Sequence, residues 1–197
     1  MPSPEAAEAL AASAFLWGYP TERWHRRLGP LARRLRRRVG MPGGKDLASF
    51  VASAARRSPE ELADAYVRAF DFTPQNALYL TAHEHADDRR RGQALLEIQE
   101  RIAAAGLRVR DGELPDFYPL LLEFVAVAGA SPVDPLEPRL RALADRLADS
   151  LSRAESVYAP LARAVQCALP VPPARLGDPP REGGEDDRTM PYPLEYG

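Results

Sequence analysis

Apolar residues recur at helical spacing along most of this chain, and this pattern limits its fold more than any other feature. One stripe steps by four, three, four and four residues through Trp24, Leu28, Leu31, Leu35 and Val39. A second stripe runs through Leu140, Leu143, Leu147, Leu151, Ala154 and Tyr158. Such steps place side chains on one face of a helix, and no sustained period-2 alternation interrupts the first 170 residues. The sequence therefore predicts an all-α, single-domain multi-helix bundle.

Start and stop signals divide this pattern into segments. The predicted helices run over 5–17, 21–39, 46–55, 58–70, 75–85, 88–105, 116–127 and 140–167. Thr21 and Asp116 are predicted N-caps, and Ser58 with Glu61 has the spacing of a capping box. Gly29-Pro30 is expected to kink or divide the second helix, and Gly106 to end the helix that precedes it.

The character of the chain changes at Pro170. Seven prolines and four glycines fall among the last 28 residues, with a cluster of acidic side chains between 182 and 187. Such a composition cannot bury enough apolar surface to offset the entropy of ordering it. We therefore predict a helical domain over 1–169 and a disordered Pro/Gly-rich acidic tail over 170–197.

Charge and cysteine content exclude several classes of protein. With 26 basic and 28 acidic side chains the net charge is -2, so no global field favours nucleic acid. Cys167 is the only cysteine, which excludes an internal disulfide and a cysteine-based metal cluster. No signal peptide is visible, and the longest apolar run, from Leu120 to Ala130, is about half a membrane span and contains Glu123. A cytoplasmic protein without membrane insertion is expected.

Residue patterns typical of catalysis are weak throughout. His83 and His85 are two apart, so on a helix they point in nearly opposite directions and cannot chelate one ion. Glu113 and Asp116 flank a predicted helix start, where acidic side chains are favoured by capping and by the helix dipole alone. The arginines of the run from Arg33 to Arg38 surround Leu35 of the first stripe and are interpreted as a solvated helix face. No catalytic residue and no metal site is predicted.

A resemblance to a known family rests on the run LYLTAHEHADDRRRGQALLEIQERIAAAGLRVRDGELPDFYPLLLEFVA, which begins at Leu78. The residues that carry it are His85, Asp87, Arg89, Arg91, Gly92, Ala94, Ala105 to Leu107, Glu113 to Asp116, and Pro119 to Phe124. Upstream, FLWGYPTERW from Phe15 and YVRAFDF from Tyr66 add to it. Together these segments resemble the respiratory nitrate reductase delta-subunit family, the NarJ-type molybdenum cofactor assembly chaperones.

The resemblance implies the all-helical fold of the redox-enzyme maturation chaperones and a role other than catalysis. Such chaperones bind the N-terminal tail of the immature catalytic (alpha) subunit of nitrate reductase and assist insertion of its molybdenum cofactor. No stably bound cofactor is expected, only transient contact with the molybdenum–guanine dinucleotide while the client matures. Cofactor-delivery proteins are compatible further partners, and nucleic acid is not expected.

The client peptide is expected to lie in a groove between helices, with aromatic walls and a polar rim. The candidate binding residues are Tyr66, Phe70, Asp71, Tyr79, His83, Arg89, Arg91, Glu113, Asp116 and Glu123. Asp87, Gly92 and Pro115 are expected to shape the corner beside them, with Gly92 permitting close helix approach. Met190 to Tyr196 of the tail is expected to fold back into the groove.

Two alternatives remain open at this point. One is a chaperone for a different molybdoenzyme. The other is a small helical metal-dependent hydrolase with His83, His85 and Asp87 at its centre.

Overall fold

The computed structural model describes residues 2–38, 40–85, 88–110, 112–128 and 133–177. Within these ranges the chain is helical and contains no strand, which confirms the predicted all-α class. The α-helices are α1 (Pro4–Leu16), α2 (Glu22–Arg26), α3 (Leu28–Arg36), α4 (Gly44–Ala54), α5 (Pro59–Tyr66), α6 (Asp88–Ala104), α7 (Tyr118–Val127), α9 (Glu137–Arg153) and α10 (Ala159–Ala168). A π-helix, η1 (Val67–Asp71), and two 3-10 segments, η2 (Pro74–Asn76) and η3 (Leu80–His83), complete the described elements. Asp87 and residues 178–197 lie outside the described residues.

Two of the predicted helix starts are confirmed in detail. The Thr21 side chain accepts a hydrogen bond from the backbone N–H of Trp24 at 3.2 Å. Ser58 accepts one from the N–H of Glu61, whose carboxylate accepts the N–H of Ser58 at 2.8 Å, so the capping box is complete. Both pairs satisfy N–H groups that a helix start leaves without intrahelical partners.

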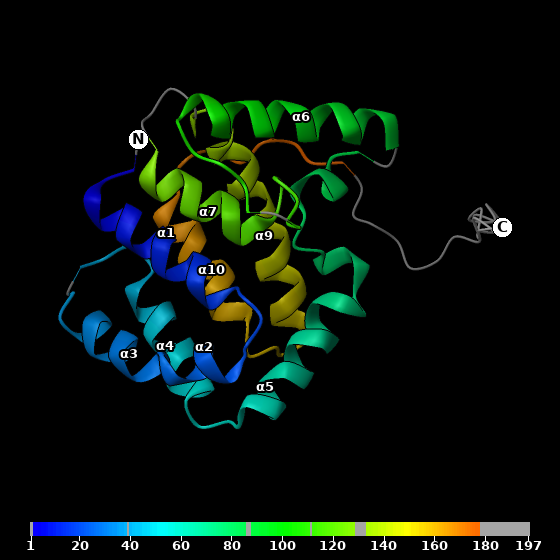
Figure 1. Ribbon diagram of the computed structural model, residues 1–197. Helices are drawn as coiled ribbons and strands as arrows, with labels where there is room; N and C mark the ends of the chain where they lie inside the picture. Colours follow the sequence, from blue (N-terminus) through cyan, green and yellow to red (C-terminus); the bar gives the residue numbers. More distant parts are fainter. Residues whose placement is uncertain (1, 39, 86–87, 111, 129–132, 178–197) are drawn as a thin grey trace, which may run out of the picture.

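Helix α1 forms the most extensive helix–helix contact of the bundle, with α7. It packs against α7 and α10, and α10 in turn contacts α9 and α4, while α3 covers α4. Figure 1 shows this arrangement, with α6 running along the end of the molecule opposite α2 and α3. A chain of aromatic rings crosses the core, from Trp24 through Phe50 and Tyr158 to Phe70 and Trp17. Neighbouring rings in this chain have centroids 5.1–6.3 Å apart, so one continuous apolar core joins the helices.

The prediction of a helix over 75–85 is wrong. This stretch forms η2, an extended turn and η3, because Tyr79 makes an antiparallel bridge with Phe117. The N–H of Tyr118 donates to the carbonyl of Leu78 at 2.8 Å, and the N–H of Leu80 donates to the carbonyl of Asp116 at 3.1 Å. These hydrogen bonds replace those that a helix would have made.

The prediction for the last helix is also wrong in one respect. Helices α9 and α10 are separate, and Glu155 between them has a left-handed φ of 49°. Pro160 lies in the first turn of α10, where its missing N–H costs nothing. The second helix is divided, as the pair Gly29-Pro30 predicted, but the division falls at Arg27, so that both residues lie in the first turn of α3.

Asp116 does not cap α7. The N-cap position is Phe117, without a side-chain hydrogen bond, and the Asp116 carboxylate is used elsewhere.

The first residues of the predicted tail, 170–177, lie against the domain. The N–H of Ala174 donates to the carbonyl of Pro138 at 2.9 Å, and Arg146 donates to the carbonyl of Gly177 at 2.6 Å. Val171 and Leu176 pack on the core. This segment therefore crosses α9 and ends beside η3, where Gly177 faces the backbone of His83 and Glu84.

None of the helices in the described ranges is long and apolar enough to cross a membrane.

Candidate functional site

Several of the predicted binding residues lie around Tyr66, which is itself buried at 7% exposure and packs on Phe70 and Tyr158 of the core. We define the aromatic–acidic surface as Tyr19, Asp71, Tyr79 and Glu113 together with the buried Tyr66 behind them. The rings of Tyr19 and Tyr66 meet edge to face with centroids 5.3 Å apart, and Tyr19 remains 50% exposed. Burial raises the pKa of Tyr66 well above its usual value, and the nearby charges of Asp71 and Glu113 raise it further. The two carboxylates therefore lie within electrostatic reach of the same phenol.

Tyr79 extends this surface toward the 113–117 segment. Its ring lies 5.4 Å from that of Phe117, and its side chain is half-buried. Burial raises the pKa of Tyr79, and the negative charges of Glu113 and Asp116 act in the same direction. Glu113 is half-buried and Leu114 is exposed, so a ligand reaching Tyr79 would meet an apolar and an acidic group together.

Asp116 is not a rim group, because it is fully buried. Its Oδ2 accepts the N–H of Thr81 at 3.0 Å and the hydroxyl of Thr81 at 2.5 Å. Arg91 of α6 donates from Nε to the same hydroxyl oxygen at 3.2 Å. The three side chains thus join η3, α6 and the segment before α7, which holds Glu113 in place on the aromatic–acidic surface.

The remaining predicted residues lie apart from this surface or serve the core. Phe70 is 6% exposed and packs among Trp17, Tyr66 and Tyr158. Glu123 is exposed on α7, and Pro115 is buried in the turn before it. Arg89 is exposed on α6.

Gly92 does not permit close helix approach, which corrects the sequence-based expectation. Among the residues that the structure describes, a Cβ added to it would meet nothing within 4 Å.

His83 is fully buried, so it cannot contact a client from this position. Its Nε2 lies 2.8 Å from the carbonyl oxygen of Ala77, and its Nδ1 lies 3.1 Å from a guanidinium nitrogen of Arg146. Because the guanidinium can only donate, Nδ1 is an acceptor and Nε2 carries the proton. With both nitrogens engaged, neither is free to ligate a metal. No group of three or more metal-binding side chains occurs among the described residues.

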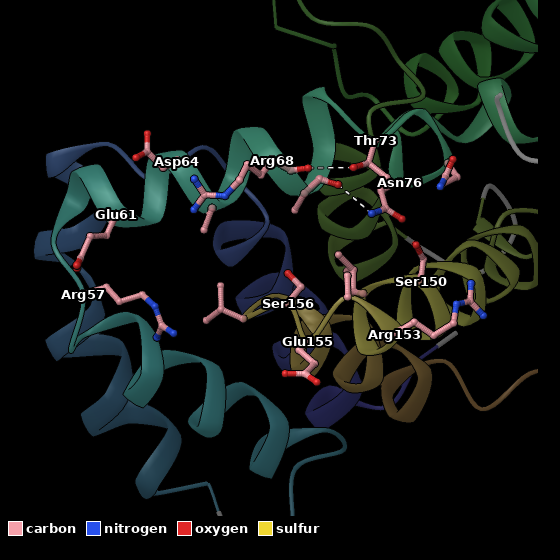
Figure 2. A pocket seen from close by; sticks show the side chains of 16 residues that line it. Arg57, Glu61, Asp64, Arg68, Thr73, Asn76, Ser150, Arg153, Glu155 and Ser156 are labelled. Atoms are coloured by element: carbon pink, nitrogen blue, oxygen red, sulfur yellow. Dashed lines mark hydrogen bonds between the residues drawn. The ribbon is translucent and has the colours of Figure 1, made fainter. Parts of the chain in front are cut away.

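Sequence reasoning missed a cleft of about 850 Å³. It lies between α5–η1–η2 on one side and the end of α9 with the following loop on the other. Figure 2 shows its labelled charged side chains: Arg57, Glu61, Asp64, Arg68, Arg153 and Glu155. In the described part of the chain, these six form no ion pair with one another.

Polar side chains hold the π-helix in the wall of this cleft. Thr73 donates to the carbonyl of Arg68, and Asn76 donates to the carbonyl of Ala69, each at 2.9 Å (Figure 2). Ala65 and Ala69 give this wall a small apolar strip. None of the predicted binding residues lines the cleft, although α5 and η1 also carry Tyr66 and Asp71 of the aromatic–acidic surface.

Comparison with known proteins gave a family match and several relatives. A family model described as "Nitrate reductase delta subunit" matches residues 41–162. The "Probable nitrate reductase molybdenum cofactor assembly chaperone NarJ" of Bacillus subtilis is 31% identical over 161 residues, which is 81% of this chain and 87% of that protein. The NarJ chaperone of Escherichia coli K12 is 32% identical over 80 residues, 41% of this chain and 34% of that protein. The "Nitrate reductase-like protein NarX" of Mycobacterium tuberculosis H37Rv is 30% identical over 78% of this chain, which spans only 23% of that protein.

Proposed function

This chain belongs to the nitrate reductase delta-subunit family, and we propose that it is an assembly chaperone that binds the N-terminal tail of an immature nitrate reductase alpha subunit. Its relatives from B. subtilis and E. coli are named as molybdenum cofactor assembly chaperones, not as catalysts. The observation that carries the proposal is the family match over residues 41–162, because it includes Tyr66, Asp71, Tyr79 and Glu113. In this role the protein acts in the cytoplasm while the client receives its molybdenum cofactor.

The aromatic–acidic surface is the place where we expect the client tail to bind. Tyr19 and Tyr79 offer apolar ring area with a hydrogen-bonding end, which suits the apolar face of an amphipathic peptide. Asp71 and Glu113 offer carboxylates to basic residues of the tail. A charge-assisted hydrogen bond between a guanidinium and a carboxylate is about twice as strong as a neutral one. The peptide would therefore be held by ring contacts and fixed in register by the two acids.

Asp116, Thr81 and Arg91 have a positioning role in this proposal. They are buried or half-buried and bond to one another, so they hold the 113–117 segment rather than contact the client. Because Asp116 is buried in this network and Glu113 is not, Glu113 is the acid whose replacement tests client binding. Replacing Asp116 would disturb the fold, whereas replacing Glu113 leaves that network intact.

The molybdenum cofactor is cargo in this scheme. We propose that any contact with the molybdenum–guanine dinucleotide is transient and occurs through the bound client. Cofactor-delivery proteins would then approach the complex of chaperone and client.

The alternative function is the same chaperone activity toward a different molybdoenzyme. The hydrolase alternative lacks a supporting observation, since both ring nitrogens of His83 are hydrogen-bonded and Asp87 lies outside the described residues.

The test is calorimetric titration of a synthetic alpha-subunit tail peptide into the full chain. The double variant Asp71→Asn/Glu113→Gln should weaken binding by about tenfold or more, because each lost charge-assisted bond contributes on the order of 1 kcal/mol. The matched control is Asp64→Asn/Glu155→Gln, which removes the same number of acids from the cleft. The control should bind the peptide as the unchanged protein does.

Three results would contradict this proposal in different ways. No binding to the unchanged protein would remove the tail as the ligand. Loss of affinity in the control but not in the test variant would move the site to the cleft. Equal loss in both would point to a general charge effect, and thermal melts of each variant establish that the fold is intact.

A further inference from the structure

Helices α2 and α3 carry a concentration of positive charge that the proposed function does not use. We call this the arginine face and define it as Arg23, Arg26, Arg27, Arg33, Arg34, Arg36, Arg37 and Arg38, all of which are exposed. No acidic residue occurs between Arg23 and Arg38, although the whole chain has a net charge of -2. The charges of this protein are therefore segregated rather than mixed.

The fold does not need so many arginines in this place. Leu28 and Leu35 are 1% and 8% exposed and attach α3 to the core. The helix dipole favours basic residues in the last turn, but one or two would satisfy it. Within α3, Arg33 and Arg36 are three residues apart, where side chains are neighbours on the helix surface and their like charges repel. The sequence thus keeps an arrangement that works against the stability of α3.

Only part of this charge is neutralised within the molecule. Glu8 of α1 pairs with Arg34 at 2.7 Å and with Arg38 at 2.9 Å. Across the described ranges, no ion pair is formed by Arg33, Arg36 or Arg37. Hollows of about 490 Å³ and 440 Å³ open beside these side chains, the first lined by Arg33 and Arg37, the second by Arg36 and Lys45. The guanidinium groups are thus accessible to an anion.

The position of the arginine face limits what can cover it. Figure 1 shows α2 and α3 at the outer edge of the bundle, at the end away from α6. Neither helix carries an exposed large apolar side chain, because Trp24, Leu28 and Leu35 are buried. The two helices therefore offer a partner charge rather than projecting apolar side chains, although Arg27 and Arg34 border an apolar hollow formed with Phe15 and Leu31. A nucleic acid is less suitable, since no exposed aromatic side chain of α2 or α3 is available to stack on bases.

We propose that the arginine face docks this protein reversibly on the phosphate groups of an anionic phospholipid surface. Clusters of four to eight basic residues on one helical surface are typical of binding to anionic headgroups, and each adds roughly fivefold to the affinity. Arginine suits phosphates because its planar guanidinium can donate two parallel hydrogen bonds to one of them. The arginine face shares no residue with the aromatic–acidic surface. This inference is independent of the proposed client tail.

The experiment is co-sedimentation of the full chain with vesicles of phosphatidylcholine alone or mixed with phosphatidylglycerol. We expect binding to the anionic vesicles only, with loss at about 0.3 M salt, where the screening length is shorter than a side chain. The variant Arg33→Gln/Arg36→Gln/Arg37→Gln should lower the affinity by about a hundredfold. Its matched control is Arg90→Gln/Arg108→Gln/Arg110→Gln, which removes three exposed arginines from α6 and the segment after it.

Each other outcome overturns the proposal. Equal binding to both kinds of vesicle would exclude headgroup charge as the cause. Equal loss in the test and control variants would show that net charge matters and the arginine face does not. Binding of inorganic pyrophosphate or GDP without binding of vesicles would assign the arginines to a soluble phosphate ligand. Thermal melts verify that each variant is folded, which is expected because all six replaced side chains are exposed.

Discussion

Burial and the neighbouring Arg146 favour the neutral form of the His83 imidazole. Nε2 donates to the carbonyl of Ala77, and Nδ1 accepts from Arg146. Burial is the main cause that lowers the pKa of His83 below 6.5, and the positive charge of Arg146 lowers it further, against the opposing effect of the Ala77 carbonyl. A proton on Nδ1 would point an N–H donor at the guanidinium N–H of Arg146, which is also a donor.

A pH dependence of stability follows from this arrangement. The pKa of His83 is lower in the folded state, so the unfolded chain binds the extra proton more readily. The stabilising contribution is therefore complete above pH 6.5 and is lost as the pH falls below that value toward the lowered pKa. Urea unfolding of the unchanged protein and of His83→Gln across this range should show a flatter pH profile in the variant. His85→Gln is the matched control, and a variant profile as steep as that of the unchanged protein would contradict the assignment.

Single residues were predictable where the signal was local. The caps at Thr21 and Ser58 need only a few neighbouring residues, and both are confirmed. Asp116 has the same local signature, but its carboxylate bonds to Thr81, 35 residues away along the chain. That partner cannot be recognised from the residues around Asp116, so the prediction of a cap was wrong.

Two glycines in helical segments should respond in opposite ways to alanine. Gly92 lies inside α6, where an added Cβ meets open space, so Gly92→Ala should stabilise the protein by about 0.5–1 kcal/mol. Gly43 has a φ of 69°, and its added Cβ would lie 2.5 Å from the backbone of Ala164 in α10. Gly43→Ala should therefore destabilise by about 2–4 kcal/mol. Urea unfolding measures both differences.

This pair also tests how α4 meets α10. If Gly43→Ala were as harmless as Gly92→Ala, the close approach of α4 to α10 would be wrong. Destabilisation by Gly92→Ala would instead mean that α6 has a neighbour at this position.

Element boundaries were predictable where the helix periodicity ended in a strong signal. Most helices of the N-terminal half follow the prediction within a few residues. The break between α9 and α10 was missed, although Pro160 inside the predicted helix was an available signal. The failure over 75–85 has a different cause, because the bridge from Tyr79 to Phe117 joins segments distant in sequence. Local propensity carries no information about such a bridge.

At the scale of the whole molecule, Glu84 and Arg139 join the segment after η3 to α9. The guanidinium donates two hydrogen bonds to the carboxylate, each at 2.6 Å. The side chains are only 11% and 22% exposed, so the pair is stronger than one in open solvent. The 170–177 segment lies beside it and ends at the backbone of Glu84.

A double-mutant cycle measures this connection. Glu84→Gln and Arg139→Gln should each destabilise the protein, and the coupling between them should be about 1–3 kcal/mol. Arg26 and Glu22 provide the exposed comparison, at 3.5 Å, where the coupling should be below about 0.5 kcal/mol. Coupling of the same size in both cycles would mean that the Glu84–Arg139 pair is solvated.

The candidate site was predictable only in part. Asp71, Tyr79 and Glu113 were named from the sequence and lie near one another with accessible side chains, whereas Tyr66, also named, is buried beside them. Tyr19 was not named as a binding residue, because its contact with Tyr66 crosses 47 positions of sequence. The cleft was missed for the same reason, since its two walls come from residues 57–76 and 150–157.

Because of the π-helix at Val67–Asp71, this fold depends on the number of residues between α5 and η2. A π turn corresponds to one residue inserted into an α-helix. It lets Phe70 face the core rings while Arg68 and Ala69 face the cleft and Asp71 faces the aromatic–acidic surface. Deleting one residue here would restore an ordinary helix and turn every later side chain to a different direction. Between α5 and η2, replacing an exposed side chain such as Arg68 is therefore a milder change than deleting one residue, which would shift Asp71 relative to Phe70 and its core contacts.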